Sequence, residues 1–170
     1  MKKCLMIAAL ALSVGMASAG TVTWAMNALT KDSSTLTGVV AYLFAGDSTD
    51  GVADAIQDGS LDYSSAIAST KTDSSTGKIS VTGIGSYSSE TVKLYTVVFD
   101  TATVTDSSNF IIAGPVSQTF GASGNKTFNF SSSAAAAAAN GWTPVAVPEP
   151  TTVALLALGL AALGLKRKVA

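Results

Sequence analysis

The chain has no histidine, a single cysteine (Cys4), and charged side chains at only 12% of its 170 positions. An average soluble domain carries about twice that share of charge. The missing histidines exclude Ser-His-Asp and Cys-His triads, and a lone cysteine cannot build a thiolate metal cluster. A formal net charge of −1 excludes a strongly basic nucleic-acid binder. We therefore expect no enzyme activity, no cofactor, no metal centre and no nucleic-acid partner.

The first residues have the pattern of a secretory signal peptide. Two N-terminal lysines precede an apolar run at 5–14, and an Ala-Ser-Ala sequence ends at Ala19. Small residues at these positions are what signal peptidase requires. The pattern predicts a signal peptide at 1–19, cut by signal peptidase between Ala19 and Gly20. Because Cys4 lies within that peptide, the mature chain would hold no disulfide.

The last residues combine a proline-rich tripeptide, an uncharged stretch and a basic cluster. Pro148-Glu149-Pro150 precedes the uncharged residues 151–165, and three basic residues follow, namely Lys166, Arg167 and Lys168. A helix over 151–165 spans about 22 Å, which is short for a bilayer core of about 30 Å unless the basic side chains reach the interface. We predict a single-pass membrane helix at 151–165, with its basic end in the cytoplasm and the rest of the chain outside.

This arrangement resembles the PEP-CTERM sorting signal of bacterial envelope proteins, a segment also known as an ice-binding protein C-terminal domain. The resemblance covers 148–168 and implies nothing about ice binding. It implies recognition by an exosortase, a membrane protease-transpeptidase that removes the tail. It further implies display at the cell surface or in the extracellular matrix, where exopolysaccharide is a candidate partner. A plain C-terminal anchor with a chance tripeptide is the alternative.

Residues 20–147 form an acidic segment between two basic ends. Five of the ten cationic residues lie in the ends, but only one of the eleven acidic residues does, so the middle carries a formal charge of −5. Seven stretches of it have the β-branched and aromatic content of strands. They are 21–26, 38–45, 78–82, 91–100, 109–113, 116–120 and 126–130. We predict an all-β domain at 20–130, a single antiparallel β-sandwich of about seven strands.

Two other segments of the middle region do not have strand patterns. The apolar spacing at 50–58 predicts one short helix, which Asp50 would cap and Gly59 would end. Residues 131–147 open with three serines and six alanines. So few alanines cannot hold an isolated helix in water. We therefore predict a poorly ordered Ser/Ala-rich stalk at 131–147, between the domain and the sorting signal.

Two kinds of ligand site remain open for the domain. Asp47, Asp50, Asp54 and Asp58 are a weak calcium candidate, although their spacing does not match an EF-hand loop. A glycan-binding sandwich would instead use exposed aromatic residues, for which the candidates are Trp24, Tyr42, Tyr63, Tyr87, Tyr95 and Trp142. The tripeptide Asp-Ser-Ser recurs at 32–34, 73–75 and 106–108, and we interpret these as three surface turns.

The sequence thus predicts an exported structural or interaction protein of the bacterial envelope or exopolysaccharide matrix. A glycan-binding module anchored at the cell surface is the alternative.

Overall fold

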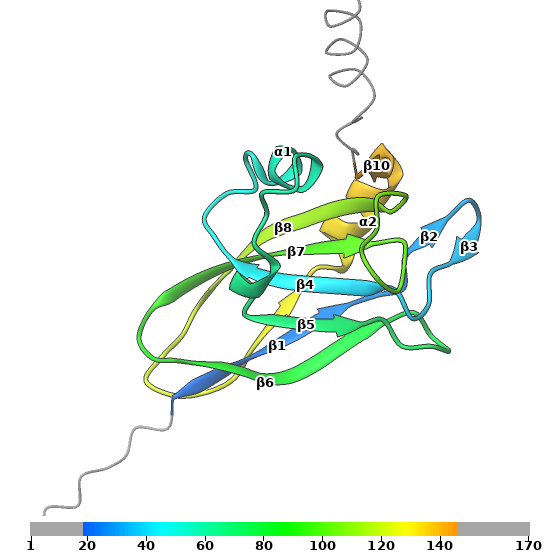
Figure 1. The fold of residues 1–170 in the computed structure, drawn as a ribbon. Helices are drawn as coiled ribbons and strands as arrows, with labels where there is room; N and C mark the ends of the chain where they lie inside the picture. Colours follow the sequence, from blue (N-terminus) through cyan, green and yellow to red (C-terminus); the bar gives the residue numbers. More distant parts are fainter. Residues whose placement is uncertain (1–18, 146–170) are drawn as a thin grey trace, which may run out of the picture.

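The computed structural model describes residues 19–145, which are the coloured elements of Figure 1. In chain order these are β1 (Gly20–Met26), β2 (Thr30–Lys31), β3 (Ser34–Thr35), β4 (Val40–Ala45), α1 (Val52–Gln57), the 3₁₀ helix η1 (Tyr63–Ser65), β5 (Ala68–Lys71), β6 (Ile79–Tyr87), β7 (Thr91–Phe99), β8 (Asn109–Thr119), β9 (Lys126–Asn129), α2 (Ser131–Asn140) and β10 (Thr143–Pro144). Strands dominate, and the prediction of an all-β class is confirmed. The start of β1 and the end of β10 lie at opposite ends of the domain (Figure 1).

The larger sheet has five strands in the order β10-β8-β7-β4-β5, and all its neighbouring strands are antiparallel. In its central strand, β7, Leu94 and Val98 belong to one hydrophobic cluster while Val97 and Phe99 belong to another. All four side chains are fully buried. Successive side chains of β7 therefore alternate between the two faces of the sheet. Because both faces are covered, β7 is apolar almost throughout.

The smaller sheet has the order β6-β1-β9. β1 runs antiparallel to β6 but parallel to β9, with Trp24 opposite Phe128. This parallel pair departs from the antiparallel arrangement that we predicted, and it is possible because a long crossover through the other sheet separates the two strands. β6 carries an extra residue at two places opposite β1. Gly83 and Gly85, with φ of 77° and 66°, supply the positive φ that suits glycine at such bulges.

The two sheets bury one hydrophobic cluster between them. The smaller sheet contributes Trp24 and Phe128 to it, and the larger sheet contributes Leu43, Leu94 and Val98. These five side chains have no exposed surface. Burying an aromatic side chain of this size contributes about 2–3 kcal/mol relative to exposure. This cluster, rather than any disulfide, holds the sheets together.

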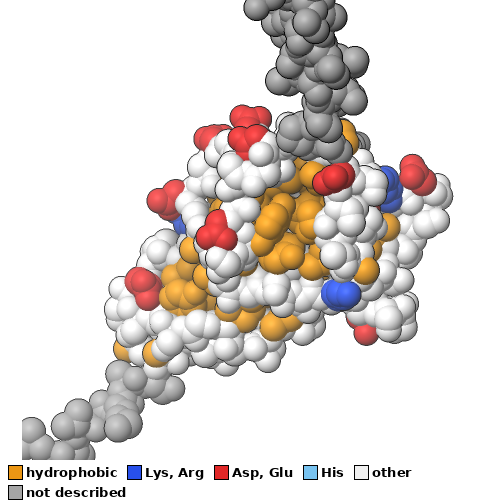
Figure 2. All heavy atoms as spheres, viewed as in Figure 1, with side chains coloured by type: hydrophobic (Ala, Val, Ile, Leu, Met, Phe, Trp, Pro, Cys, Tyr) orange, Lys and Arg blue, Asp and Glu red, His pale blue; other side chains and the backbone are white. Residues whose placement is uncertain are grey.

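A second hydrophobic cluster covers the outer face of the larger sheet. Phe44, Phe99 and Phe110 from the sheet pack with Val52 and Ile56 from α1. The chain between β4 and β5, including α1 and η1, lies over this face (Figure 1). Figure 2 shows that hydrophobic surface remains visible between the covering segments. One face of the sheet is therefore closed by the other sheet, and its opposite face is only partly closed.

Several elements differ from the prediction in extent. The stretches 109–113 and 116–120 form one strand, β8, because pairing with β7 continues through a register shift between Leu94 and Thr96. The strand β5 was not predicted because its sequence, ASTK, has no apolar run; backbone pairing with β4 places it at the sheet edge.

The predicted short helix is present as α1, but its cap is different. Gly51, in a left-handed conformation with φ of 73°, is the N-cap, and no side chain caps the helix. Asp50 is therefore not the cap that we predicted. Gly59, with φ of 75°, follows the last turn, where a left-handed glycine commonly ends a helix.

The expectation of a poorly ordered stalk at 131–147 is wrong for its first part. Residues Ser131–Asn140 form α2, which lies against β8 and β1. Ala134 is fully buried in the cluster between the sheets, and Ala137 and Ala138 pack against that cluster. Tertiary contacts thus supply the stability that six alanines lack in isolation. The polyalanine segment is a docked part of the domain.

Candidate functional site

The end of the described chain is tied to the domain by backbone hydrogen bonds. Thr143 and Pro144 of β10 pair with Phe110 and Asn109 of β8. The N–H of Val145 then donates to the carbonyl of Ser108 at 2.9 Å. The folded domain therefore continues to residue 145.

The predicted sorting residues lie beyond this point. Pro148, Glu149 and Pro150, the stretch 151–165, and the basic residues Lys166, Arg167 and Lys168 all fall outside the described residues. Among residues 19–145, no helix is both long enough and apolar enough to cross a membrane. The prediction of a membrane helix thus concerns only the part of the chain that follows the domain.

The residues of the predicted signal-peptidase site lie at the start of β1. Ala19 is partly buried and precedes the strand, and Gly20 is its first residue and is buried. Gly20 pairs with Tyr87 of β6. A Cβ atom at position 20 would lie 1.9 Å from the carbonyl oxygen of Gly124. The domain therefore begins at the residue that the signal-peptide prediction places first, and packing requires glycine there.

The aromatic residues proposed for glycan binding fall into different environments. Trp24 is fully buried between the sheets and Tyr95 is 7% exposed, so neither offers a ring face to a ligand. Tyr87 is partly buried and packs against Phe120 at a centroid distance of 5.1 Å. Trp142 lies at the other end of the domain, just before β10. None of these four residues shares an exposed surface with the other two candidates, Tyr42 and Tyr63.

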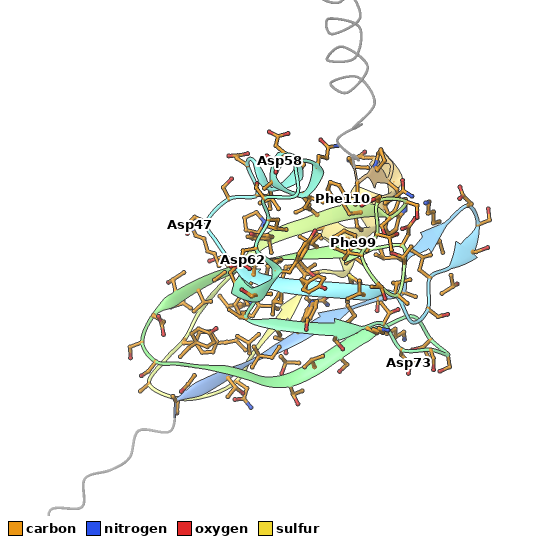
Figure 3. All side chains as sticks on the ribbon, viewed as in Figure 1. Asp47, Asp58, Asp62, Asp73, Phe99 and Phe110 are labelled. Atoms are coloured by element: carbon orange, nitrogen blue, oxygen red, sulfur yellow. The ribbon has the colours of Figure 1, made fainter. Side chains whose placement is uncertain are left out.

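Tyr42 and Tyr63 do come together, on the outer face of the larger sheet. Their ring centroids are 4.9 Å apart, and Phe99 contacts both rings edge-on at 6.2 and 6.0 Å. Both tyrosines are only partly buried. Burial, with a smaller effect of Tyr42, raises the pKa of the Tyr63 hydroxyl. We call Tyr42, Tyr63 and Phe99 the outer aromatic cluster. Figure 3 shows Phe99 and Phe110 close together on this face, and Asp62 lies on the loop beside them.

The acidic residues proposed as a weak calcium site do not converge. Among residues 19–145, no group of three or more acidic side chains is arranged to hold a metal ion. Asp47 instead pairs with Lys93, with an N···O distance of 3.2 Å. Asp58 accepts hydrogen bonds from Ser60, and these lower the pKa of its carboxyl group. These carboxylates therefore act locally in loops and turns.

A partly buried polar cluster that sequence reasoning missed lies near β10. Lys31 Nζ is 2.5 Å from Asp100 Oδ2, and their side chains are 25% and 9% exposed. Asn109 donates its backbone N–H to Asp100 Oδ1 at 2.7 Å and its side-chain Nδ2–H to Oδ2 at 2.8 Å. The indole ring of Trp142 lies 5.8 Å from Lys31 Nζ. Sequence reasoning missed this cluster because folding alone brings β2 to the ends of β7 and β8.

Opposing influences set the ionisation of Asp100. Burial raises the pKa of its carboxyl group, but the hydrogen bonds from Lys31 and Asn109, with the positive charge of Lys31, hold it below the ordinary value. Lys31 and Asp100 form an ion pair in the structure. A recess of about 380 Å³ beside it is lined by Lys31, Asn109 and Trp142, so the cluster communicates with solvent.

Comparison with known proteins identifies the segment after the domain. Residues 146–168 match the PEP-CTERM protein-sorting motif, as the sequence predicted. The match begins at the residue that follows Val145, the last residue of the described domain. No curated protein and no solved structure matches the chain. The motif implies export to the cell envelope or surface and processing by an exosortase.

Proposed function

We propose that this protein is a structural component of the bacterial cell surface or exopolysaccharide matrix. Its acidic β-domain, residues 20–145, would be the displayed part, after removal of a signal peptide at 1–19. The sorting segment would anchor the domain by a membrane helix at 151–165 until an exosortase acts at Pro148-Glu149-Pro150. We further propose that the domain is a β-sandwich and acts without catalysis.

The observation that carries this proposal is the direct join between domain and sorting motif. Backbone hydrogen bonds hold the chain to Val145, and the motif begins at the next residue. The two ends of the domain lie far apart (Figure 1), so an anchor after β10 would leave the end that carries the start of β1 directed away from the membrane. Only five residues, 146–150, separate the folded domain from the predicted membrane helix, and so short a connection suits a structural unit better than a module on a long tether.

Glu149→Gln tests the sorting step in a host that contains the exosortase. The chain has only one other glutamate, Glu90, which is exposed on the domain. Glu90→Gln is therefore a control with the same chemical change. Wild type and Glu90→Gln should be recovered from the surface without Lys166, Arg167 and Lys168, as measured by intact mass. Glu149→Gln should keep the basic tail and remain in the membrane fraction.

Two results would contradict the proposal. Wild-type protein that retains residues 166–168 in the presence of the exosortase would show that the motif is not processed. Normal processing of Glu149→Gln would show that the carboxylate of the tripeptide is not needed. A strain that lacks the exosortase gives the reference mass for the unprocessed chain.

A second candidate function is glycan binding at the outer aromatic cluster. Tyr42 and Tyr63 present partly exposed rings beside each other. A recess of about 260 Å³ lies farther along the sheet and is lined by Ala53, Phe110, Ile112 and Asn140; the Phe110 ring is 6.2 Å from that of Phe99. Apolar sugar faces stack on such rings, while hydroxyl and amide groups bind sugar hydroxyls. Matrix polysaccharide would be the ligand class.

Binding of the exported protein to exopolysaccharide from an exosortase-containing bacterium tests this second function. Tyr63→Leu keeps apolar bulk and removes the aromatic face, so it should weaken binding about tenfold, which corresponds to loss of one stacking contact. Tyr87→Leu, far from the cluster, is the control and should bind as wild type does. Equal binding by both variants, or none by wild type, would exclude this site.

A further inference from the structure

One carboxylate oxygen, Asp100 Oδ2, contacts both the amine of Lys31 and the side-chain amide of Asn109. Lys31 Nζ and Asn109 Nδ2 both contact Asp100 Oδ2, at 2.5 and 2.8 Å. Two donors that share one acceptor oxygen are about 4–5 Å apart. A nucleophile, an acid–base group and a carbonyl carbon are thus neighbours in a partly buried site.

We propose that Lys31 and Asn109 form an intramolecular isopeptide bond and that Asp100 acts as the acid–base group for its formation. The product is an amide between Lys31 Nζ and Asn109 Cγ. No oxidant, metal or external reagent is needed. The inference rests on this cluster alone and does not depend on the proposed function.

The reaction balances with these three groups. Asp100 Oδ2 takes a proton from the Lys31 ammonium, which leaves a neutral amine and a neutral carboxylic acid. A half-turn of the Asn109 amide brings Oδ1 to the acid, whose O–H then polarises the carbonyl. The Nζ lone pair forms a bond to Cγ, and the Cγ–Nδ2 bond breaks. Asp100 carries two protons in all from Nζ to Nδ2, so ammonium leaves and the carboxylate is restored.

The surroundings favour this reaction over simple ion pairing in three ways. Asp100 also accepts the backbone N–H of Asn109, and this bond keeps the electrophile beside the acid–base group while the side-chain amide turns. Asp100 is 9% exposed and the Trp142 ring lies over the amine, so the pair is partly shielded from water, and this burial favours the neutral forms of both groups. The adjoining recess gives ammonium a way out.

The bond would also stabilise the domain next to β10, after which the sorting motif begins. Lys31 lies in β2, which belongs to the small hairpin sheet, and Asn109 lies in β8 of the larger sheet, opposite Pro144 of β10. No backbone ladder joins β2 to β8 among the described strands. A covalent link between them would close a long loop and couple the hairpin to the strand that leads to the sorting motif.

Mass spectrometry of the full exported protein tests the inference directly. Loss of ammonia lowers the mass by about 17 Da per chain. Trypsin cannot cut after an acylated lysine, so the peptide that contains Lys31 should extend to Lys71 and remain joined to residues 94–126. Cleavage after Lys93, which is also ion-paired but exposed, should be normal and serves as an internal control.

Two variants distinguish the isopeptide bond from other reactions that remove ammonia. Lys31→Arg keeps the charge but cannot form the amide, and Asp100→Asn removes the acid–base group. Both should show the unmodified mass and a melting temperature lower by roughly 10 °C. Cyclisation of Asn109 to a succinimide would also remove ammonia, but it would persist in Lys31→Arg and leave the two peptides separate. An unmodified wild-type mass, or a mass loss without joined peptides, overturns the proposal whatever the variants do.

Discussion

A Cβ atom added to Gly20 would lie 1.9 Å from the carbonyl oxygen of Gly124 and 2.9 Å from the Phe120 ring. The first residue of β1 thus passes directly beneath the turn between β8 and β9. The next residue reinforces this contact, because the backbone N–H of Thr21 donates to Asn125 Oδ1 at 3.1 Å. Position 20 is therefore constrained by the folded domain itself, independently of any peptidase preference for small residues.

Replacing Gly20 with alanine should destabilise the domain. The added methyl group meets backbone atoms that cannot rotate away, so we expect a loss of about 1–3 kcal/mol in the free energy of unfolding. Gly121→Ala is the control, because a Cβ there meets nothing closer than 3.8 Å. Urea denaturation of the mature proteins measures both. Equal stability of the two variants would mean that the turn does not close over β1.

Asp73 makes one turn of the domain sensitive to acid. Its Oδ1 accepts hydrogen bonds from the backbone N–H and hydroxyl groups of Ser75 and Thr76, at 2.6 to 3.0 Å. These bonds, the Ser75 hydroxyl foremost, hold the pKa of the carboxyl group well below its ordinary value. The stabilisation is therefore fully present above the unfolded-state pKa of about 3.9 and is lost as the pH falls toward the folded-state pKa.

The acid sensitivity can be measured with Asp73→Asn. The urea midpoint of wild type should fall between about pH 5 and pH 2, and part of this decrease should be absent in Asp73→Asn. The effect should be small because the carboxylate is exposed. A profile for Asp73→Asn that superimposes on wild type would show that the turn contributes nothing.

The sequence predicted the strands well where they are apolar and poorly where they are not. β7 was found because most of its side chains are buried on both faces, and β1 because buried side chains alternate with partly buried ones. β5 and the β2–β3 hairpin have mostly polar residues and are held by backbone pairing, which leaves no trace in hydrophobic pattern. The sorting motif was found because its recognition depends on local sequence, whereas the Lys31–Asp100–Asn109 cluster depends on contacts between distant segments.

The segment after β9 shows the same limit of local reasoning. Six alanines without a tertiary partner would not hold a helix, and the sequence contains no sign of the partner. Ala134 nevertheless has no exposed surface, whereas Ala136, two residues on, is exposed. The small side chain is what allows α2 to approach the sheet closely.

The docking of α2 can be tested with a matched pair of substitutions. Ala134→Asp places a carboxylate in the core and should destabilise the domain by at least about 2–3 kcal/mol. Ala136→Asp has the same effect on helix propensity but faces solvent, so it should cost about 0.7 kcal/mol or less. Thermal unfolding of both proteins measures the difference. Similar melting temperatures would indicate a detached helix, as the stalk prediction required.

The three Asp-Ser-Ser tripeptides provide a final test, because the structure gives their last serines different roles. Ser34 and Ser75 are exposed, but Ser108 is only 1% exposed. Its hydroxyl accepts the backbone N–H of Thr105 at 2.8 Å and lies 2.7 Å from the Thr101 hydroxyl. The third tripeptide is also a turn with Asp106 and Ser107 exposed, as interpreted, but its last serine is buried.

Ser108→Ala should be the most destabilising of the three serine-to-alanine changes. It leaves the Thr105 N–H without its acceptor and removes one of the two hydrogen bonds of the Thr101 hydroxyl, which costs about 1–3 kcal/mol. Ser75→Ala removes one exposed hydrogen bond, to Asp73, and should cost well under 1 kcal/mol, while Ser34→Ala should be close to neutral. The three serines share the same local sequence. If Ser108→Ala did not cause the largest loss of stability of the three, the Ser108 hydroxyl group would not be what closes the loop after β7.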